Sequence, residues 1–131
     1  MEDRYLFRGK RIDNGEWVEG YLSYPFCTKK GNESYYFYAK DSLGFFCRCV
    51  VDASTICQCT GLKDKNGNLI WENDIVKINN SKANTVVAFR DFEIICTIPN
   101  EKYYKHRLEY DTEYEVIGNI FDNPELLESE D

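Results

Sequence analysis

The sequence has little of several features that particular classes of protein need. It holds only three prolines and one histidine, and no apolar run approaches the roughly 18 to 20 residues of a membrane-spanning helix. The shortage of proline excludes a proline-rich segment. The chain begins Met-Glu-Asp-Arg-Tyr, where an export signal would be basic and then apolar, so we expect a cytoplasmic protein without membrane contact.

Common catalytic and phosphate-binding motifs are also missing. The chain has no G-x-S-x-G, no G-x-x-x-x-G-K-[ST], no G-x-G-x-x-G and no H-E-x-x-H. The single histidine, His106, would have to serve any nucleophilic triad, and its bulky cationic neighbours indicate an exposed loop residue. Paired carboxylates for acid–base catalysis are neither indicated nor excluded. We therefore predict no catalytic residues, no cofactor and no enzymatic activity.

The six cysteines include two C-x-C pairs, Cys47-Arg-Cys49 and Cys57-Gln-Cys59. In extended strands both thiols of a pair project from the same face. Structural zinc sites usually need a longer spacing, such as C-x-x-C. We predict buried, reduced thiols without a bound metal, and keep a zinc site and redox chemistry as less favoured alternatives.

The formal net charge of −7 comes mostly from one end of the chain. Residues 122–131 hold five acids and neither Lys nor Arg, which leaves 18 acids against 16 bases in the rest. A phosphate-binding domain would be strongly basic, so this balance disfavours general affinity for nucleic acid.

Abundant hydrophobic residues, 43% of the chain, are arranged in short runs between turn signals. Asn14-Gly15 and Asn66-Gly67 each predict a tight hairpin with positive φ at both residues. We expect a single domain over residues 1–131, mainly β, forming a small barrel or sandwich of about eight to ten short strands, with SH3-like barrel elements as one form. The expected strands lie near 4–12, 16–24, 34–39, 45–51, 55–62, 75–78, 85–89, 92–98 and 114–121.

Only two segments have a helical pattern. Asn123 precedes Pro124 and a run of acids and leucines that ends at Glu128, which predicts a short C-terminal helix with a capping residue before its first turn. Residues 102–109 lack a two-residue alternation, so they form either one helical turn or an insertion loop.

Two clusters of basic and aromatic residues are candidates for nucleic-acid contact. Aromatic faces can stack on bases while cations follow the phosphates. Acids lie beside both clusters in the sequence, which favours a solvated, salt-bridged surface instead. The candidate contacts are Arg4, Arg8, Lys10 and Arg11 in the first cluster and Lys102, Tyr103, Tyr104, Lys105 and Arg107 in the second.

Three segments resemble the YopX family of phage and prophage proteins. Residues 5–20 begin Tyr-Leu-Phe-Arg-Gly-Lys; residues 60–76 read Thr-Gly-Leu-Lys-Asp-Lys-Asn-Gly-Asn-Leu-Ile-Trp-Glu-Asn-Asp-Ile-Val; and residues 116–126 read Val-Ile-Gly-Asn-Ile-Phe-Asp-Asn-Pro-Glu-Leu. The family usually has an aromatic residue in place of Cys59 and glycine in place of Asn73. The second departure suggests a left-handed backbone at Asn73, which asparagine can adopt.

The resemblance implies a small cytoplasmic protein encoded by a phage or prophage, with no catalytic positions to carry over. The shared segment is expected to act as scaffold, with Trp71, Ile75 and Val76 in the core. Asp74 would accept backbone N–H bonds at the start of a strand.

We expect a non-enzymatic phage or prophage accessory protein that acts by binding or self-assembly. Its partner would be a second copy of the chain, or a host or phage protein. Ten Tyr, eight Phe and two Trp are more than a small barrel can bury, and self-association would also pair open strand edges. The alternative is a nucleic-acid-binding accessory protein of phage replication or regulation, which the charge balance disfavours.

Overall fold

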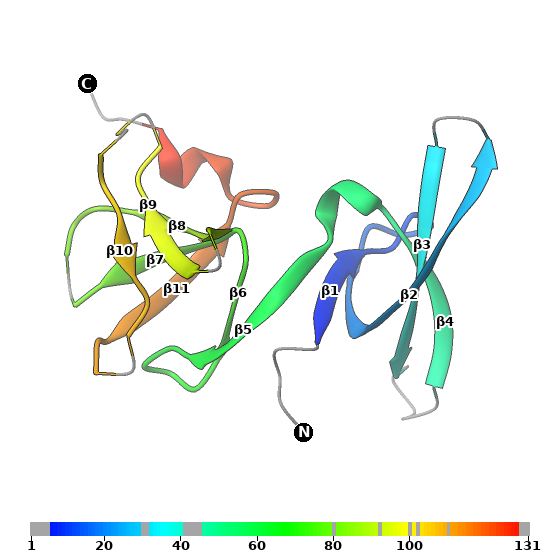
Figure 1. The fold of residues 1–131 in the computed structure, drawn as a ribbon, viewed down its shortest axis with the longest axis horizontal. Coiled ribbons are helices and arrows are strands. Elements are labelled where there is room, and N and C mark those ends of the chain that lie inside the picture. Colours follow the sequence, from blue (N-terminus) through cyan, green and yellow to red (C-terminus); the bar gives the residue numbers. More distant parts are fainter. Residues whose placement is uncertain are drawn as a thin grey trace. The chain divides into compact units, whose positions relative to one another are not determined.

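The fold is described from a computed structural model of the chain (Figure 1). The described residues form eleven β-strands and two short 3-10 turns, so the mainly-β prediction is confirmed. The structure describes residues 6–29, 32–40, 46–79, 81–91, 93–99, 101, 103–109 and 111–128, with the backbone only at 22–29, 32–36, 39–40 and 46–47.

The chain divides into two compact units, residues 1–59 and residues 60–131. The expectation of one domain over residues 1–131 stays a prediction. The first unit contains β1 (Phe7–Lys10), β2 (Trp17–Lys29), β3 (Asn32–Lys40), β4 (Phe46–Val51), the 3-10 turn η2 (Ala53–Thr55) and the start of β5 (Cys57–Lys63).

The second unit is built around a five-stranded antiparallel sheet with the strand order β10-β9-β8-β7-β11. Its remaining strand, β6, belongs to the six-stranded sheet, whose order is β4-β3-β2-β1-β5-β6. Each of the nine predicted strand regions contains a strand in its described part. The elements of the second unit are β6 (Leu69–Trp71), β7 (Asp74–Ile78), β8 (Thr85–Arg90), β9 (Glu93–Thr97), β10 (His106–Arg107), β11 (Tyr114–Asn119) and the 3-10 turn η3 (Pro124–Leu127).

Neither sheet closes into a barrel in the described residues, and this part of the prediction is wrong. In the first unit, the last residue of β4, Val51, is joined to Arg11, the residue after β1, by a single β-bridge. Two backbone bonds flank it, from Asp52 N–H to Lys10 C=O at 2.8 Å and from Ile12 N–H to Val50 C=O at 3.1 Å. Closure needs a continuous ladder between the first and last strands, and this contact is too short to form one.

Both Asn-Gly sequences lie in hairpin turns as predicted, but only the glycines have positive φ, 72° at Gly15 and 84° at Gly67. Each turn is longer than two residues. The N–H of Arg11 donates to the carbonyl of Glu16 at 2.9 Å, and the N–H of Asp64 donates to the carbonyl of Asn68 at 2.8 Å. In a longer loop the asparagine adopts an ordinary turn conformation and the glycine takes the left-handed one.

Asp64 holds the second of these turns and joins it to β11. One carboxylate oxygen accepts the N–H groups of Asn66 and Asn68, each at 2.9 Å, and the other accepts the N–H of Val116 at 3.0 Å. Lys65 N–H donates to the Tyr114 carbonyl at 2.8 Å. The turn therefore covers part of the outer edge of β11, an edge that would otherwise be open to other chains.

The turn between β6 and β7 confirms two predictions. Asn73 has φ 70°, the left-handed conformation that its departure from glycine suggests. Asp74 is 1% exposed and accepts the N–H of Trp71 at 2.8 Å. Trp71, Ile75 and Val76 are buried, as expected of core residues.

The core of the second unit takes one residue or more from most of its strands. Alternate residues of β7 enter it, because a strand presents every second side chain to the same face. Thr85, also buried, donates its hydroxyl to the Val76 carbonyl at 2.9 Å, which satisfies its polar group inside the core. The buried cluster is Ile70, Val76, Ile78, Val87, Cys96 and Tyr114.

The predicted C-terminal helix is wrong: only the four-residue turn η3 forms. Asn123, the expected cap, has φ −132° and ψ 47° and makes no side-chain bond to the turn. Its Oδ1 instead accepts the N–H of Asn119 at 3.2 Å. Because this bond commits Asn123 to the preceding loop, Leu126 N–H reaches the Asn123 carbonyl at 3.1 Å in the tighter 3-10 pattern.

The described part of residues 102–109 contains a strand, where a helical turn or loop is predicted. His106 pairs with Cys96 and Arg107 with Ile95, so β10 adds an outer strand to β9. Within the described ranges, no helix is long and apolar enough to cross a membrane.

Replacing Asp64 by Ala is expected to lower the free energy of unfolding by about 2–4 kcal/mol, because three backbone N–H groups lose a charged acceptor. Urea unfolding followed by circular dichroism measures this. The control is Asp111→Ala, an exposed carboxylate for which we expect a change within about 0.5 kcal/mol. Equal effects of the two substitutions would contradict the role of Asp64.

Gly118→Ala is expected to cost about 1–3 kcal/mol, because an added Cβ would lie 2.5 Å from Asn123 Oδ1 and 2.9 Å from its Cβ. The Asn123 side chain would have to move and release the Asn119 N–H. Thermal unfolding of Gly118→Ala, Asn123→Ala and the double variant tests this. The double variant should cost less than the sum of the two single ones, and strict additivity would disprove the steric explanation.

Candidate functional site

Several polar side chains of the three YopX-like segments bond to the backbone of their own unit. Besides the carboxylates of Asp64 and Asp74, the hydroxyl of Thr60, which is 3% exposed, donates to the Ile70 carbonyl at 2.7 Å. Asn119 Oδ1 accepts the N–H groups of Phe121 at 3.0 Å and of Asp122 at 2.9 Å. In the structure, these side chains therefore stabilise the fold.

Two residues of the first basic cluster, Arg8 and Lys10, lie on β1 of the first unit. Arg8 and Lys10 are two residues apart on β1 and share a face, and Lys10 pairs with Trp17 across the hairpin. The Arg8 guanidinium lies 4.7 Å from the centre of the Trp17 ring, and the Lys10 ammonium 5.4 Å. Both cations are thus attracted to the ring face, each by about 0.5–1 kcal/mol at exposed sites. Arg4 lies outside the described residues.

Arg11, the last predicted contact of this cluster, forms an ion pair with Asp13. Its Nε and one terminal nitrogen donate to the two carboxylate oxygens at 2.9 Å and 2.7 Å. The hydrogen bond from Arg11 lowers the pKa of Asp13. Within the hairpin turn the Arg11 charge is therefore largely balanced, as the neighbouring acids in the sequence indicate.

Two cations of the second basic cluster, Lys105 and Arg107, contact Glu93 on β9 of the second unit. Lys105 lies 3.0 Å from one carboxylate oxygen of Glu93, and Arg107 donates to the other. The hydrogen bond from Lys105, with the charge of Arg107, holds the pKa of Glu93 below its usual value. One carboxylate thus faces two cations. Tyr103 is 90% exposed and Tyr104 is half-buried, while Lys102 lies outside the described residues.

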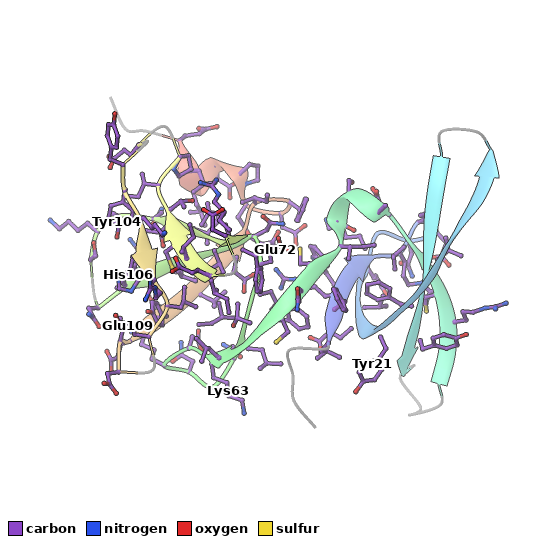
Figure 2. The ribbon with its side chains drawn as sticks, viewed as in Figure 1. Tyr21, Lys63, Glu72, Tyr104, His106 and Glu109 are labelled. Atoms are coloured by element: carbon purple, nitrogen blue, oxygen red, sulfur yellow. The ribbon has the colours of Figure 1, made fainter. Side chains whose placement is uncertain are left out.

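His106 is not the exposed loop residue that its neighbours indicate. It is half-buried in β10 (Figure 2), and its Nε2 lies 2.9 Å from the hydroxyl of Tyr114. The two rings meet edge to face with centroids 5.8 Å apart. The Tyr114 hydroxyl also accepts the N–H of Glu109 at 2.9 Å, and burial raises the pKa of Tyr114. These bonds hold the loop between β10 and β11 against the sheet.

The cysteines whose side chains are described are buried thiols, as predicted. Cys57 and Cys59 lie on the same face of β5 with no exposed surface, and Cys57 donates its thiol hydrogen to the Thr55 carbonyl at 3.2 Å. Burial raises the pKa of Cys96 to about 11, so this thiol is protonated at neutral pH. Among the residues described, no three His, Cys, Asp or Glu side chains are grouped as metal ligands. The side chains of Cys27 and Cys47 lie outside the description.

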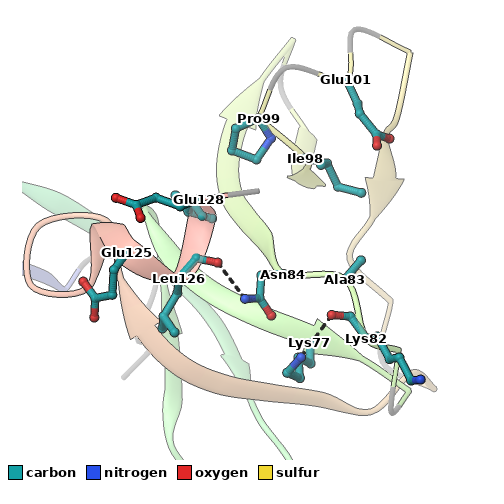
Figure 3. A pocket seen from close by; sticks show the side chains of 11 residues that line it. Lys77, Lys82, Ala83, Asn84, Ile98, Pro99, Glu101, Glu125, Leu126 and Glu128 are labelled. Carbon is teal, nitrogen blue, oxygen red and sulfur yellow. Dashed lines mark hydrogen bonds between the residues drawn. The ribbon is translucent and has the colours of Figure 1, made fainter. Parts of the chain in front are cut away.

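A cleft of about 880 Å³ lies in the second unit and was not predicted from the sequence. Figure 3 shows it between η3, the loop before β8 and the segment after β9. Asn84 lines it, and its Nδ2 donates to the Leu126 carbonyl at 2.7 Å. Sequence reasoning missed this cleft because its lining residues come from four separate segments and share no motif.

Comparisons with known proteins support the family resemblance that the three sequence segments indicate. The chain is similar to the crystal structure of protein EF1440 from Enterococcus faecalis, with a TM-score of 0.55 and 26% sequence identity over 93% of this chain and 96% of that one. Among curated proteins, none matches this sequence. A model of the YopX protein family matches residues 6–128, which is nearly the whole length. The chain therefore belongs to the YopX family.

Proposed function

We propose that this chain is a cytoplasmic, non-enzymatic phage or prophage accessory protein that acts by self-assembly. The observation that carries the proposal is a two-stranded ribbon, formed by residues 26–29 of β2 and 32–34 of β3. This ribbon extends beyond the strands that flank it in the first unit.

The pairing of the strands defines the ribbon. β2 has thirteen residues, yet β1 pairs only with Trp17–Gly20. On the other side, β4 pairs with Tyr35–Lys40 of β3 and not with the residues before them. In the part of the chain that the structure describes, the ribbon therefore has no further strand on either outer edge (Figure 1).

Two open edges favour pairing with another chain. A two-stranded hairpin is only marginally stable in water, and its outer N–H and C=O groups form a template for an added strand. A second copy offers the same edge, so antiparallel pairing about a two-fold axis is self-complementary. Pro25 lacks an N–H, and the register shifts between Leu22 and Pro25. Both features limit pairing to short stretches, which favours a closed assembly over an open-ended one.

The test is the molar mass in solution. Size-exclusion chromatography with light scattering, at several dilutions, is expected to give a small multiple of the monomer mass. Replacing residues 26–34 by Asn-Gly shortens the ribbon to the Pro25–Tyr35 pair, where β3 begins to pair with β4, and is expected to give a monomer. Circular dichroism checks that this variant still folds. A monomeric natural chain, or a folded short-ribbon variant that still assembles, would refute the proposal.

Binding of single-stranded nucleic acid is a second candidate function, favoured by Tyr103. This side chain is 90% exposed, and two cations that share one carboxylate, Lys105 and Arg107, follow it within four residues of the sequence. An exposed ring beside excess positive charge can stack on a base while the cations contact phosphates.

Glu93 allows this second function to be tested by both gain and loss of affinity. In fluorescence anisotropy with a labelled single-stranded oligonucleotide, Glu93→Gln should tighten binding because it releases both cations. Changing Lys105 and Arg107 together to Ala should weaken binding and reduce the slope of log K against log salt by about one to two. If all three proteins bind equally or not at all, the second function is excluded.

A further inference from the structure

The chain contains two Asn-Gly sequences, Asn14-Gly15 and Asn66-Gly67, and in each the asparagine is exposed. Asparagine followed by glycine can modify itself, because glycine has no side chain to keep its backbone nitrogen away from Cγ of the asparagine. Asparagine is accordingly counted among the thermolabile residues. The hydrogen bonds around the two side chains decide which of them reacts faster.

The side chain of Asn14 is held by the turn in which it lies. Its Oδ1 accepts the N–H of Glu16 at 2.9 Å, and its Nδ2 lies 3.5 Å from a carboxylate oxygen of the same residue. The N–H of Gly15 donates to the Arg11 carbonyl at 2.9 Å. An attack of the Gly15 nitrogen on Cγ would disturb all three bonds, because Cγ becomes tetrahedral and the nitrogen leaves its acceptor.

Asn66, in the turn between β5 and β6, is bonded to this turn by its backbone alone. Its N–H donates to Asp64 at 2.9 Å, while its side-chain amide has no hydrogen-bond partner among the residues that the structure describes. The N–H of Gly67 donates to the Asp64 carbonyl at 3.1 Å, a longer bond than the one that holds Gly15. Apart from its neighbours in the chain, no described residue lies within 4 Å of the point where a Cβ of Gly67 would be, so a ring has room to form.

We propose that Asn66 is a site of spontaneous modification in the folded chain and that it reacts faster than Asn14. The Gly67 nitrogen forms a bond to Asn66 Cγ and passes its proton, through water, to Nδ2, which leaves as ammonia. One water molecule then opens the resulting five-membered imide at either of its two carbonyls. The product is aspartate or isoaspartate, and the reaction consumes one water and releases one ammonia.

Isoaspartate at this position disrupts the hydrogen bonds of Asp64. One oxygen of Asp64 accepts the N–H groups of residues 66 and 68. In isoaspartate the main chain runs through the former side chain, which adds one carbon between these two N–H groups and leaves a new carboxylate beside Asp64. The N–H groups lose the spacing that lets both reach one oxygen, and the two carboxylates repel each other. The modification therefore loosens the turn that covers part of the edge of β11.

Peptide mapping by mass spectrometry measures the reactions of both asparagines in one sample. The full chain is kept at mildly alkaline pH, and samples taken over time are digested with trypsin at mildly acidic pH, where the modification is slow. Cleavage after Lys and Arg places Asn14 in a peptide of residues 12–29 and Asn66 in a separate peptide that ends at Lys77. Fragmentation assigns the change within the second peptide, which also holds Asn68 and Asn73.

The same chain unfolded in urea is the control, because unfolding removes the bonds that hold Asn14. We compare the rate at Asn66 divided by the rate at Asn14 in the two states. This ratio is expected to be about five times larger in the folded chain, the effect that one additional net hydrogen bond supports. Equal ratios, a smaller ratio in the folded chain, or no reaction of folded Asn66 would overturn the proposal.

Asn66→Gln tests the consequence for the turn, because glutamine keeps the backbone bonds and forms the corresponding six-membered ring far more slowly. The urea midpoint of the natural chain is expected to fall as Asn66 is converted to isoaspartate, whereas the midpoint of the variant stays constant over the same time. Equal loss in both proteins, or conversion of Asn66 with an unchanged midpoint, would show that the modification does not loosen the turn.

Discussion

The carboxylate of Asp64 joins a local turn to a strand that lies fifty-two residues further along the chain. It accepts two N–H groups of its own turn and one of β11, while it is almost fully buried. A buried charge is stable only when hydrogen bonds satisfy it. In forming these bonds Asp64 places β11 in the five-stranded sheet and covers part of its edge, and the core around Tyr114 and Val76 depends on that placement.

Other polar residues of the YopX-like segments also form hydrogen bonds to the backbone. Asp74, Thr60 and Asn119 each bond to backbone groups of a turn or a neighbouring strand. These side chains therefore stabilise the turns and strand contacts of their own unit. Two other surface features lie elsewhere, the β2–β3 ribbon in the first unit and the cleft beside η3 in the second.

The charged side chains of the two basic clusters interact mainly with groups close to them. Arg11 is paired with Asp13, and Lys105 and Arg107 with Glu93, so the basic clusters seen in the sequence are largely balanced where they occur. Arg8 and Lys10 lie over the face of Trp17.

Local patterns predicted the local structure well. Alternating apolar residues and turn signals located the strands, and the replacement of glycine at Asn73 correctly indicated its left-handed backbone. The helix after Asn123 was predicted from the same kind of local signal and does not form, because the Asn123 side chain is used by Asn119 instead. A capping pattern indicates only a preference for a helix, and a competing hydrogen bond from a nearby loop can override that preference.

The sequence by itself therefore determined the mainly-β class, the positions of the turns, the buried thiols and the family. Each of these follows from neighbouring residues or from a shared motif. Only the tertiary structure decided that neither sheet closes within the described residues, that His106 packs on Tyr114, and that a cleft forms beside η3. These features depend on which distant segments meet, and that choice is made by packing and hydrogen bonding over the whole unit.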